Sequence, residues 1–453
     1  MIPNPHSALH IYEADKKCAA VCTLMSQNGF RFDVDRAAVY IDKLKGLESD
    51  ALTRAESAIN RPLKRTKTGG ISVKDMHGAF FFDLGAPVLK RSELTGKASI
   101  DVNALRAYSV CADPALRYLA LAILDRRKAQ KIRSTYIQKI ILDADGRVHP
   151  TWHNAGPITG RFSCSGPSFM QLPRGASDPT YQESNGKVVE PWGGVRSLYV
   201  PDPGYVIVGF DKSQLELRVA AYTTGCPAYI AAIESGDVHS HNAKLVFGQA
   251  FIDELNETKR IKASDPKFKG TVLYVKIRTQ AKTFIFALNY MAGAETIYAQ
   301  CIAAGLQVKL RGIQAVLNKL HRQYKHYYDW QAENLLKIKA CGYVYSPIMQ
   351  RARWVGFDPQ PTECANFPIQ AGAADVMNTE LPLLHAAQQK YFPKAKLLAQ
   401  VHDAVYSEVP RAEADSYVAM LEDTCQQEFS ISTSGSEFKV RFPIDIDVSE
   451  RWK

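Results

Sequence analysis

The chain has 453 residues, 46% of them hydrophobic, which is enough to bury the cores of about two to four domains. Its 56 basic against 46 acidic residues give a net charge of +10, a modest excess that favours a polyanionic partner. The nine scattered cysteines favour buried thiols over disulfides or a zinc site, and no apolar run approaches membrane-spanning length, so we expect a cytoplasmic protein with no membrane partner.

The first third of the chain has helical periodicity. Two helices are predicted before residue 60, separated by a short turn at 29–33, and a third covers 116–142. The stretches 64–70 and 88–97 are basic and flexible in composition. Such stretches are usually solvated loops, but the same composition suits contacts with phosphates.

A strand is predicted at 146–153, followed by a tight backbone at Gly160. Arg161 comes directly after this glycine, either as a hydrogen-bond donor to a ligand or as a surface arginine beside a turn. Residues 175–194 are polar, contain glycine and proline, and are predicted to be an inserted loop.

Residues 205–210 form an apolar run typical of a buried strand. Asp211 ends this run, and Ser213 is predicted to cap a helix that presents Leu215 and Leu217. On its own this pattern indicates no more than a capped helix.

Four residues near the middle of the chain recur every fourth position: Arg278, Lys282, Phe286 and Tyr290. On a helix this spacing makes one stripe, cationic at its start and aromatic at its end. A solvated cationic pair beside an aromatic core pair would have the same spacing. Further helices are predicted at 299–306 and 312–336.

Residues 397–409 are predicted to be two short strands that meet at His402 and Asp403, and the chain closes with a strand at 444–448. An ordinary hairpin, whose Asp satisfies backbone donors, is the simpler alternative. Together, however, two carboxylates, a cationic pair and an aromatic pair suit metal-assisted phosphoryl transfer.

These segments resemble motifs A, B and C of the family A DNA polymerases, the bacterial DNA polymerase I type. Motif A usually reads Asp-Tyr-Ser-Gln-Ile-Glu-Leu-Arg, and residues 211–218 read Asp-Lys-Ser-Gln-Leu-Glu-Leu-Arg. Motif B, Arg-x-x-x-Lys-x-x-x-Phe/Tyr, corresponds to 278–286, and motif C, Val-His-Asp-Glu, to 401–404. Segments at 159–165, 237–248, 342–353 and 366–375 also resemble the family, and the helices of the first third resemble its thumb. The resemblance covers nearly everything from residue 18 onward.

The resemblance implies an α+β, right-hand polymerase with a mixed or antiparallel palm sheet and largely helical fingers and thumb. The predicted divisions are thumb 1–146, palm 147–232, fingers 233–344 and a second palm segment 345–453. The implied activity is template-directed extension of a DNA primer with dNTPs. Because no Asp-x-Glu exonuclease segment precedes the thumb, we expect no proofreading domain.

The resemblance also implies roles for particular residues. Asp211, Asp403 and the backbone carbonyl of Lys212 would hold two Mg²⁺ ions, or Mn²⁺. Contacts to the incoming nucleotide are expected from Gln214, Glu216, His239, Arg278, Lys282, Phe286 and Tyr290. Contacts to primer–template DNA are expected from Arg161, Asn366, Gln370 and His402. The small residues of 366–375 would let a duplex approach the backbone closely, and Lys282 would also protonate the pyrophosphate.

Three positions depart from the family motifs. Ala404 stands where motif C has a glutamate, and Ala287 and Met291 stand where motif B has glycines. Two rival functions stay open, a single-subunit RNA polymerase and an inactive primer–template-binding protein. Glu216 argues against the first rival. The retained Asp211, Asp403, Arg278 and Lys282 argue against the second. A separate exonuclease, helicase or processivity factor is a possible partner.

Overall fold

The centre of the molecule is a four-stranded antiparallel sheet in the order β11-β12-β8-β15. Its strands are β11 Lys396–Val401, β12 Ala404–Pro410, β8 Tyr205–Lys212 and β15 Ile444–Ser449. Helices α14 (Pro361–Tyr391) and α15 (Ala414–Thr424) lie beside it. β8 is buried along most of its length because its branched and aromatic side chains pack on both faces.

The computed structural model describes residues 5–67, 69–93, 95–154, 156–173, 183–184, 187–188, 194–236, 238, 241–242, 291, 293–303, 309–433 and 436–452. The helices not yet named are α1 Pro5–Asn28, α2 Val34–Ile59, α3 Val73–Gly78, α4 Val102–Tyr108, α5 Pro114–Lys131, α6 Leu215–Thr224, α7 Pro227–Glu234, α11 Ala294–Ala303, α12 Leu310–Gln323 and α13 Lys325–Cys341. The other strands are β1 Phe30–Phe32, β2 Arg147–Val148, β3 Thr151–His153, β4 Ser163–Ser165, β5 Glu183–Ser184, β6 Lys187–Val188, β7 Tyr199–Val200, β9 Tyr343–Tyr345, β10 Ala352–Trp354, β13 Glu428–Thr433 and β14 Ser436–Arg441.

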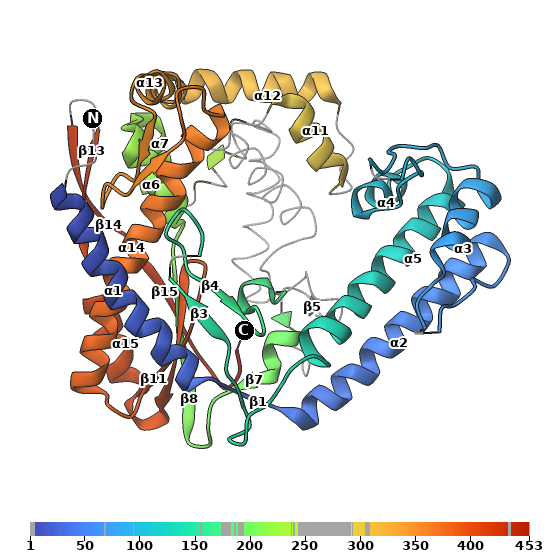
Figure 1. Ribbon diagram of the computed structural model, residues 1–453, viewed down its shortest axis with the longest axis horizontal. Helices are drawn as coiled ribbons and strands as arrows, with labels where there is room; N and C mark the ends of the chain where they lie inside the picture. Colours follow the sequence, from blue (N-terminus) through green and yellow to red (C-terminus); the bar gives the residue numbers. More distant parts are fainter. Residues whose placement is uncertain are drawn as a thin grey trace, which may run out of the picture.

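Helices α2 to α5 form a helical arm that stands away from the sheet, with α4 at its tip (Figure 1). The long helices α2 and α5 pack against each other, and both start at an aspartate cap: Asp33 accepts from the Arg36 amide and Asp113 from the Leu116 amide, each at 2.9 Å. α4 lies next to α11, which belongs to the part of the chain opposite the arm. The predicted α+β, right-hand fold class is confirmed.

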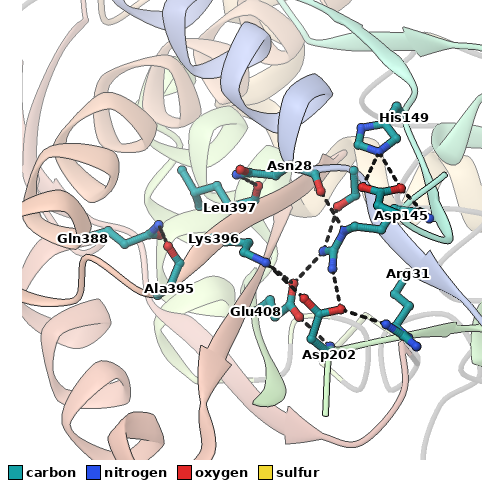
Figure 2. A network of polar contacts seen from close by, with 12 residues as sticks. Asn28, Arg31, Asp145, His149, Asp202, Gln388, Ala395, Lys396, Leu397 and Glu408 are labelled. Atoms are coloured by element: carbon teal, nitrogen blue, oxygen red, sulfur yellow. Dashed lines mark hydrogen bonds and ion pairs between the residues drawn. The ribbon is translucent and has the colours of Figure 1, made fainter. Parts of the chain in front are cut away.

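A network of ion pairs joins the base of the helical arm to the sheet (Figure 2). Arg147, on β2, lies 2.9 Å from Asp202 and 2.6 Å from Glu408 of β12. Lys396 of β11 and Arg31 of β1 also pair with Asp202, at 3.1 and 3.3 Å. The short strand β1, which sits between α1 and α2, is therefore fixed to the same sheet that carries Asp211.

Several predicted elements have different limits. The helix predicted at 116–142 is α5, which ends at Lys131 and continues as a π-helix over Ile132–Ile137. The strand predicted at 146–153 is two strands, interrupted near Pro150, which has no N–H to donate to a ladder. The helix predicted at 312–336 is divided into α12 and α13 at Tyr324.

All nine cysteines are free thiols and seven of them are buried, as predicted. Among the helices that the structure describes, none combines the length and apolarity needed to cross a bilayer. The predicted divisions after residues 146, 232 and 344 stay predictions.

Candidate active site

Strands β11 and β12 meet in a two-residue turn made of His402 and Asp403, which confirms the predicted pair of strands. Such tight turns require left-handed backbone, which usually selects glycine or asparagine. His402 adopts a φ of 56° without that freedom. Backbone strain of this kind concentrates at functional sites, where other contacts hold it in place.

The central strand β8 brings Asp211 to this turn. Asp211 lies opposite Ala404 in the ladder, and the Lys212 amide donates to the Asp403 carbonyl at 3.0 Å. β8 therefore runs two residues beyond the end predicted from its apolar run, because Lys212 is also paired with Ile444 of β15. Two carboxylates far apart in the sequence become neighbours at one edge of the sheet.

Asp211 and Asp403 line one cavity of about 370 Å³. Its other lining residues are Met170, Gln171, Leu172, Pro173, Arg196, Val401, His402, Ala404 and Tyr406. Within the part of the chain that the structure describes, the Asp403 carboxylate has no hydrogen-bond or ion-pair partner. Burial raises the pKa of Asp403 to about 6; the charge of Arg161 opposes this shift, and Glu216 and Asp211 add to it.

The oxygen donors around this cavity fit a hard divalent cation. Two carboxylates face it, and the Lys212 carbonyl leaves β8 on the same side as the amide that bonds to Asp403. No group of three His, Cys, Asp or Glu side chains converges as a metal site among the described residues. A cation here would therefore need backbone and solvent oxygens to complete its shell.

The side chain of Lys212 is directed away from the cavity, onto the opposite face of the sheet. Its ammonium is buried, pairs with Glu380 of α14 at 2.5 Å and donates to the carbonyls of Cys425 and, at 3.2 Å, Phe442. The backbone carbonyl is therefore the part of Lys212 that is available to the site. The sequence predicts a metal-binding role for that carbonyl alone.

Arg161 and Glu216, predicted to contact different ligands, form an ion pair with each other. Glu216 lies in the first turn of α6, and Arg161 follows Gly160, whose φ of 79° favours glycine. A Cβ on Gly160 would also approach Arg351 Nε to 2.8 Å. The pair lies close enough to Asp403 for both charges to affect its pKa.

The start of α6 differs from the prediction. Ser213 does not cap the helix, because its amide donates to the Pro443 carbonyl at 2.9 Å and the residue before the helix, Gln214, has a φ of 55°. The Gln214 side chain donates to the Gly236 carbonyl at 3.1 Å. Gln214 thus connects the end of β8 to the segment that follows α7.

Two basic groups border the carboxylates. Partial desolvation, together with the charges of Arg161 and Arg196, lowers the pKa of His402, so its imidazole is neutral at physiological pH.

The sequence does not predict Arg196 as a site residue, although Arg196 lines the cavity. It donates to the Leu172 carbonyl at 3.2 Å and lies 4.8 Å from the Trp452 ring centroid. The signal available in the sequence was a single arginine inside the apolar segment 195–199.

Asn366 and Gln370 lie one helical turn apart on α14 and are half-buried, but neither lines the cavity of the carboxylates. The small residues after them pack inside the protein. A Cβ on Gly372 would approach Val219 of α6 and Pro347 to 2.8 Å. The prediction that these small residues admit a duplex to the backbone is wrong at Gly372, which instead permits contact between α14 and α6.

The remaining predicted site residues are His239, Arg278, Lys282, Phe286 and Tyr290, which lie outside the described residues. Their roles stay predictions.

The chain is similar to known proteins. The model of DNA polymerase family A matches residues 40–453. The thermostable DNA polymerase I of Thermus aquaticus is 24% identical, over 97% of this chain and 48% of that protein. DNA polymerase I of Aquifex aeolicus is 24% identical, over 94% of this chain and 64% of that protein. The chain therefore spans about half the length of the Thermus relative.

A solved structure has a similar fold. It is the polymerase domain of Pol1 from M. smegmatis, in complex with DNA primer-template and dNTP, and it is 19% identical with a TM-score of 0.72, covering 96% of this chain and 69% of that one. Because the family model spans most of the sequence, this chain belongs to DNA polymerase family A.

Proposed function

We propose that this chain is a template-directed DNA polymerase, which extends a DNA primer with dNTPs. The observation that carries the proposal is the convergence of Asp211 and Asp403 at one cavity on the central sheet of a family A fold. Among the residues that the structure describes, the half-buried Asp403 carboxylate has no hydrogen-bond or ion-pair partner, so an arriving cation would meet a negative charge that no direct partner neutralises.

Asp211, Asp403 and the Lys212 carbonyl would hold two Mg²⁺ ions, and Mn²⁺ suits the same oxygen donors. When bound, such ions supply Lewis acidity toward the primer 3′-hydroxyl and charge neutralisation on the leaving pyrophosphate. The hairpin turn and the β8 ladder hold the two carboxylates in register before any ligand arrives, which lowers the cost of organising the site.

The residues around the carboxylates would position the substrates. Glu216 would stand against the 2′ position of the incoming sugar, while Arg161 would donate to the primer terminus. Their ion pair couples the two positions, because moving either side chain exposes the charge of the other. A neutral His402 can donate or accept one hydrogen bond at the primer end without adding a positive charge beside the cations.

Primer extension tests the proposal against its two rivals. A labelled primer–template is incubated with dNTPs or rNTPs, with Mg²⁺ or with a chelator. A DNA polymerase extends the primer with dNTPs far better than with rNTPs, and only with the divalent cation. Efficient rNTP incorporation would instead indicate an RNA polymerase, and binding of primer–template without extension would indicate an inactive binding protein.

A further inference from the structure

Asp211 has a neighbour on each side in the sheet. Ala404 lies opposite it on β12, and Asp445 lies opposite it on β15. Directly opposite residues of an antiparallel pair project from the same face, with Cβ atoms about 4.5–5.5 Å apart. A methyl group therefore flanks Asp211 on one side, at the position where motif C usually has glutamate, and a carboxylate flanks it on the other.

Asp445 also shares a hollow with Asp211. A second cavity, of about 290 Å³, is lined by Asp211, Asp445, Asp447 and Tyr406, together with Ile207, Gly209, Phe210, Ile446 and Ser449. It adjoins the first cavity, because Asp211 and Tyr406 line both. The Asp445 side chain is exposed and has no ion-pair or hydrogen-bond partner in the described part of the chain.

We propose that Asp445 is a positioning residue of the divalent-cation site. It supplies a third carboxylate from β15, whereas β12 has Ala404 at the position where motif C usually has glutamate. This inference rests on the proposed function. Because no three acidic side chains converge on one point in the described residues, Asp445 acts through its charge or through bound water and not as a direct ligand. The Asp403 carboxylate lies in the adjoining cavity and has no partner among the described residues, which independently indicates that this face of the sheet is built for a cation.

The neighbouring Asp447 provides a matched control on the same strand and the same face. It lies opposite Gly209, two residues farther along β8 from Asp211. Two residues of a strand correspond to about 6.8 Å, and electrostatic attraction to a cation at Asp211 weakens with distance and screening. If Asp445 acts by proximity to Asp211, removing the charge of Asp447 will have a much smaller effect.

The test measures Mn²⁺ binding directly, by the electron paramagnetic resonance signal of free Mn²⁺. The sample is the full chain with primer–template DNA, a chain-terminated primer and the matching dNTP, against a blank of DNA and dNTP. Compared with wild type, Asp445→Asn is expected to weaken Mn²⁺ binding about fivefold to tenfold, and Asp447→Asn less than about twofold. Asp445→Glu keeps the charge and is expected to bind like wild type.

A compensating variant separates charge from any local structural effect. Ala404→Glu combined with Asp445→Asn is expected to recover Mn²⁺ binding, because it moves the third carboxylate to the other side of Asp211. Unchanged binding in Asp445→Asn, or no recovery in the double variant, would overturn the assignment of Asp445 while extension by wild type kept the proposed function intact. A wild type that neither binds Mn²⁺ nor extends a primer would overturn both.

Discussion

Arg147 Nη2 lies 2.6 Å from Glu408 Oε2, and the two side chains are only 6% and 0% exposed. Arg147 also donates to the carbonyls of Asn28 and Gly29, beside strand β1 at the base of the helical arm. Glu408 belongs to β12, the strand that begins directly after Asp403. The pair therefore fixes the arm to the strand that directly follows one of the two site carboxylates.

Removing Arg147 leaves the buried Glu408 carboxylate with only Lys396, at 3.9 Å, as a cationic partner among the described residues. We expect Arg147→Ala to lower the free energy of unfolding by about 3–5 kcal/mol. The matched control is Arg411→Ala, since Arg411 pairs with Glu450 at the same 2.6 Å but with side chains 59% and 64% exposed. Urea unfolding of both variants measures the difference, and equal losses would show that burial does not determine the strength of the Arg147 pair.

The buried pair of Lys212 and Glu380 makes a second stability prediction. Lys212→Met leaves the Glu380 carboxylate buried without its cation, which is expected to cost about 3–5 kcal/mol. Lys212→Met combined with Glu380→Leu replaces both charges by apolar groups and is expected to recover at least half of that loss. A double variant no more stable than Lys212→Met would mean that the carbonyl contacts of Lys212, and not its charge pair, determine the cost.

Asp375 makes stability depend on pH. It is fully buried on α14, accepts from the Met349 amide at 2.9 Å and lies 3.8 Å from Arg351 Nε. Burial raises the pKa of Asp375 to about 6, while Ser346, Met349 and Arg351 oppose that shift and Asp15 adds to it. The folded protein therefore holds this proton more tightly than the unfolded chain, so the stabilisation is present below about pH 4 and is lost as the pH rises through about 6.

The variant Asp375→Asn removes this titration. The unfolding free energy of wild type relative to Asp375→Asn is expected to fall by roughly 2 kcal/mol between pH 4.5 and 7.5. Urea titrations at a series of pH values measure it. A difference that stays constant, or that grows with pH, would contradict the raised pKa.

Selection against ribonucleotides is predicted to depend on the bulk of Glu216. Glu216→Ala is expected to raise the ratio of kcat/KM for rNTP over dNTP about tenfold to a hundredfold. Glu216→Gln keeps the bulk but loses the charge that pairs with Arg161, so its ratio is expected to stay near wild type. If the glutamine variant were as permissive as the alanine variant, the ion pair would be the selecting feature.

Local patterns in the sequence are sufficient to predict the strands that bring the two carboxylates together. The apolar run before Asp211 and the paired runs around His402 and Asp403 have strand character of their own, and β8, β11 and β12 form as predicted. The family resemblance then placed the two aspartates in one site, and the ladder between Asp211 and Ala404 brings them to one cavity.

Contacts between distant segments could not be predicted in this way. The Ser213 amide is bonded to Pro443, more than two hundred residues away, so the expected cap is replaced by a left-handed Gln214. The pairing of Arg161 with Glu216 likewise depends on how the loop of Arg161 folds against the first turn of α6. The role of Gly372 is set by Val219 on another helix, which no local pattern reveals.

Single-turnover primer extension by Asp211→Asn and Asp403→Asn tests the metal-site assignment most directly. The control is Asp423→Asn, on the exposed side of α15. Both site variants are expected to lose about a thousandfold or more in extension rate, because each removes a carboxylate ligand, while primer–template binding stays unchanged. Asp423→Asn is expected to extend like wild type. Near-normal extension by either site variant would contradict the assignment of Asp211 and Asp403 as the residues that hold the catalytic metal ions.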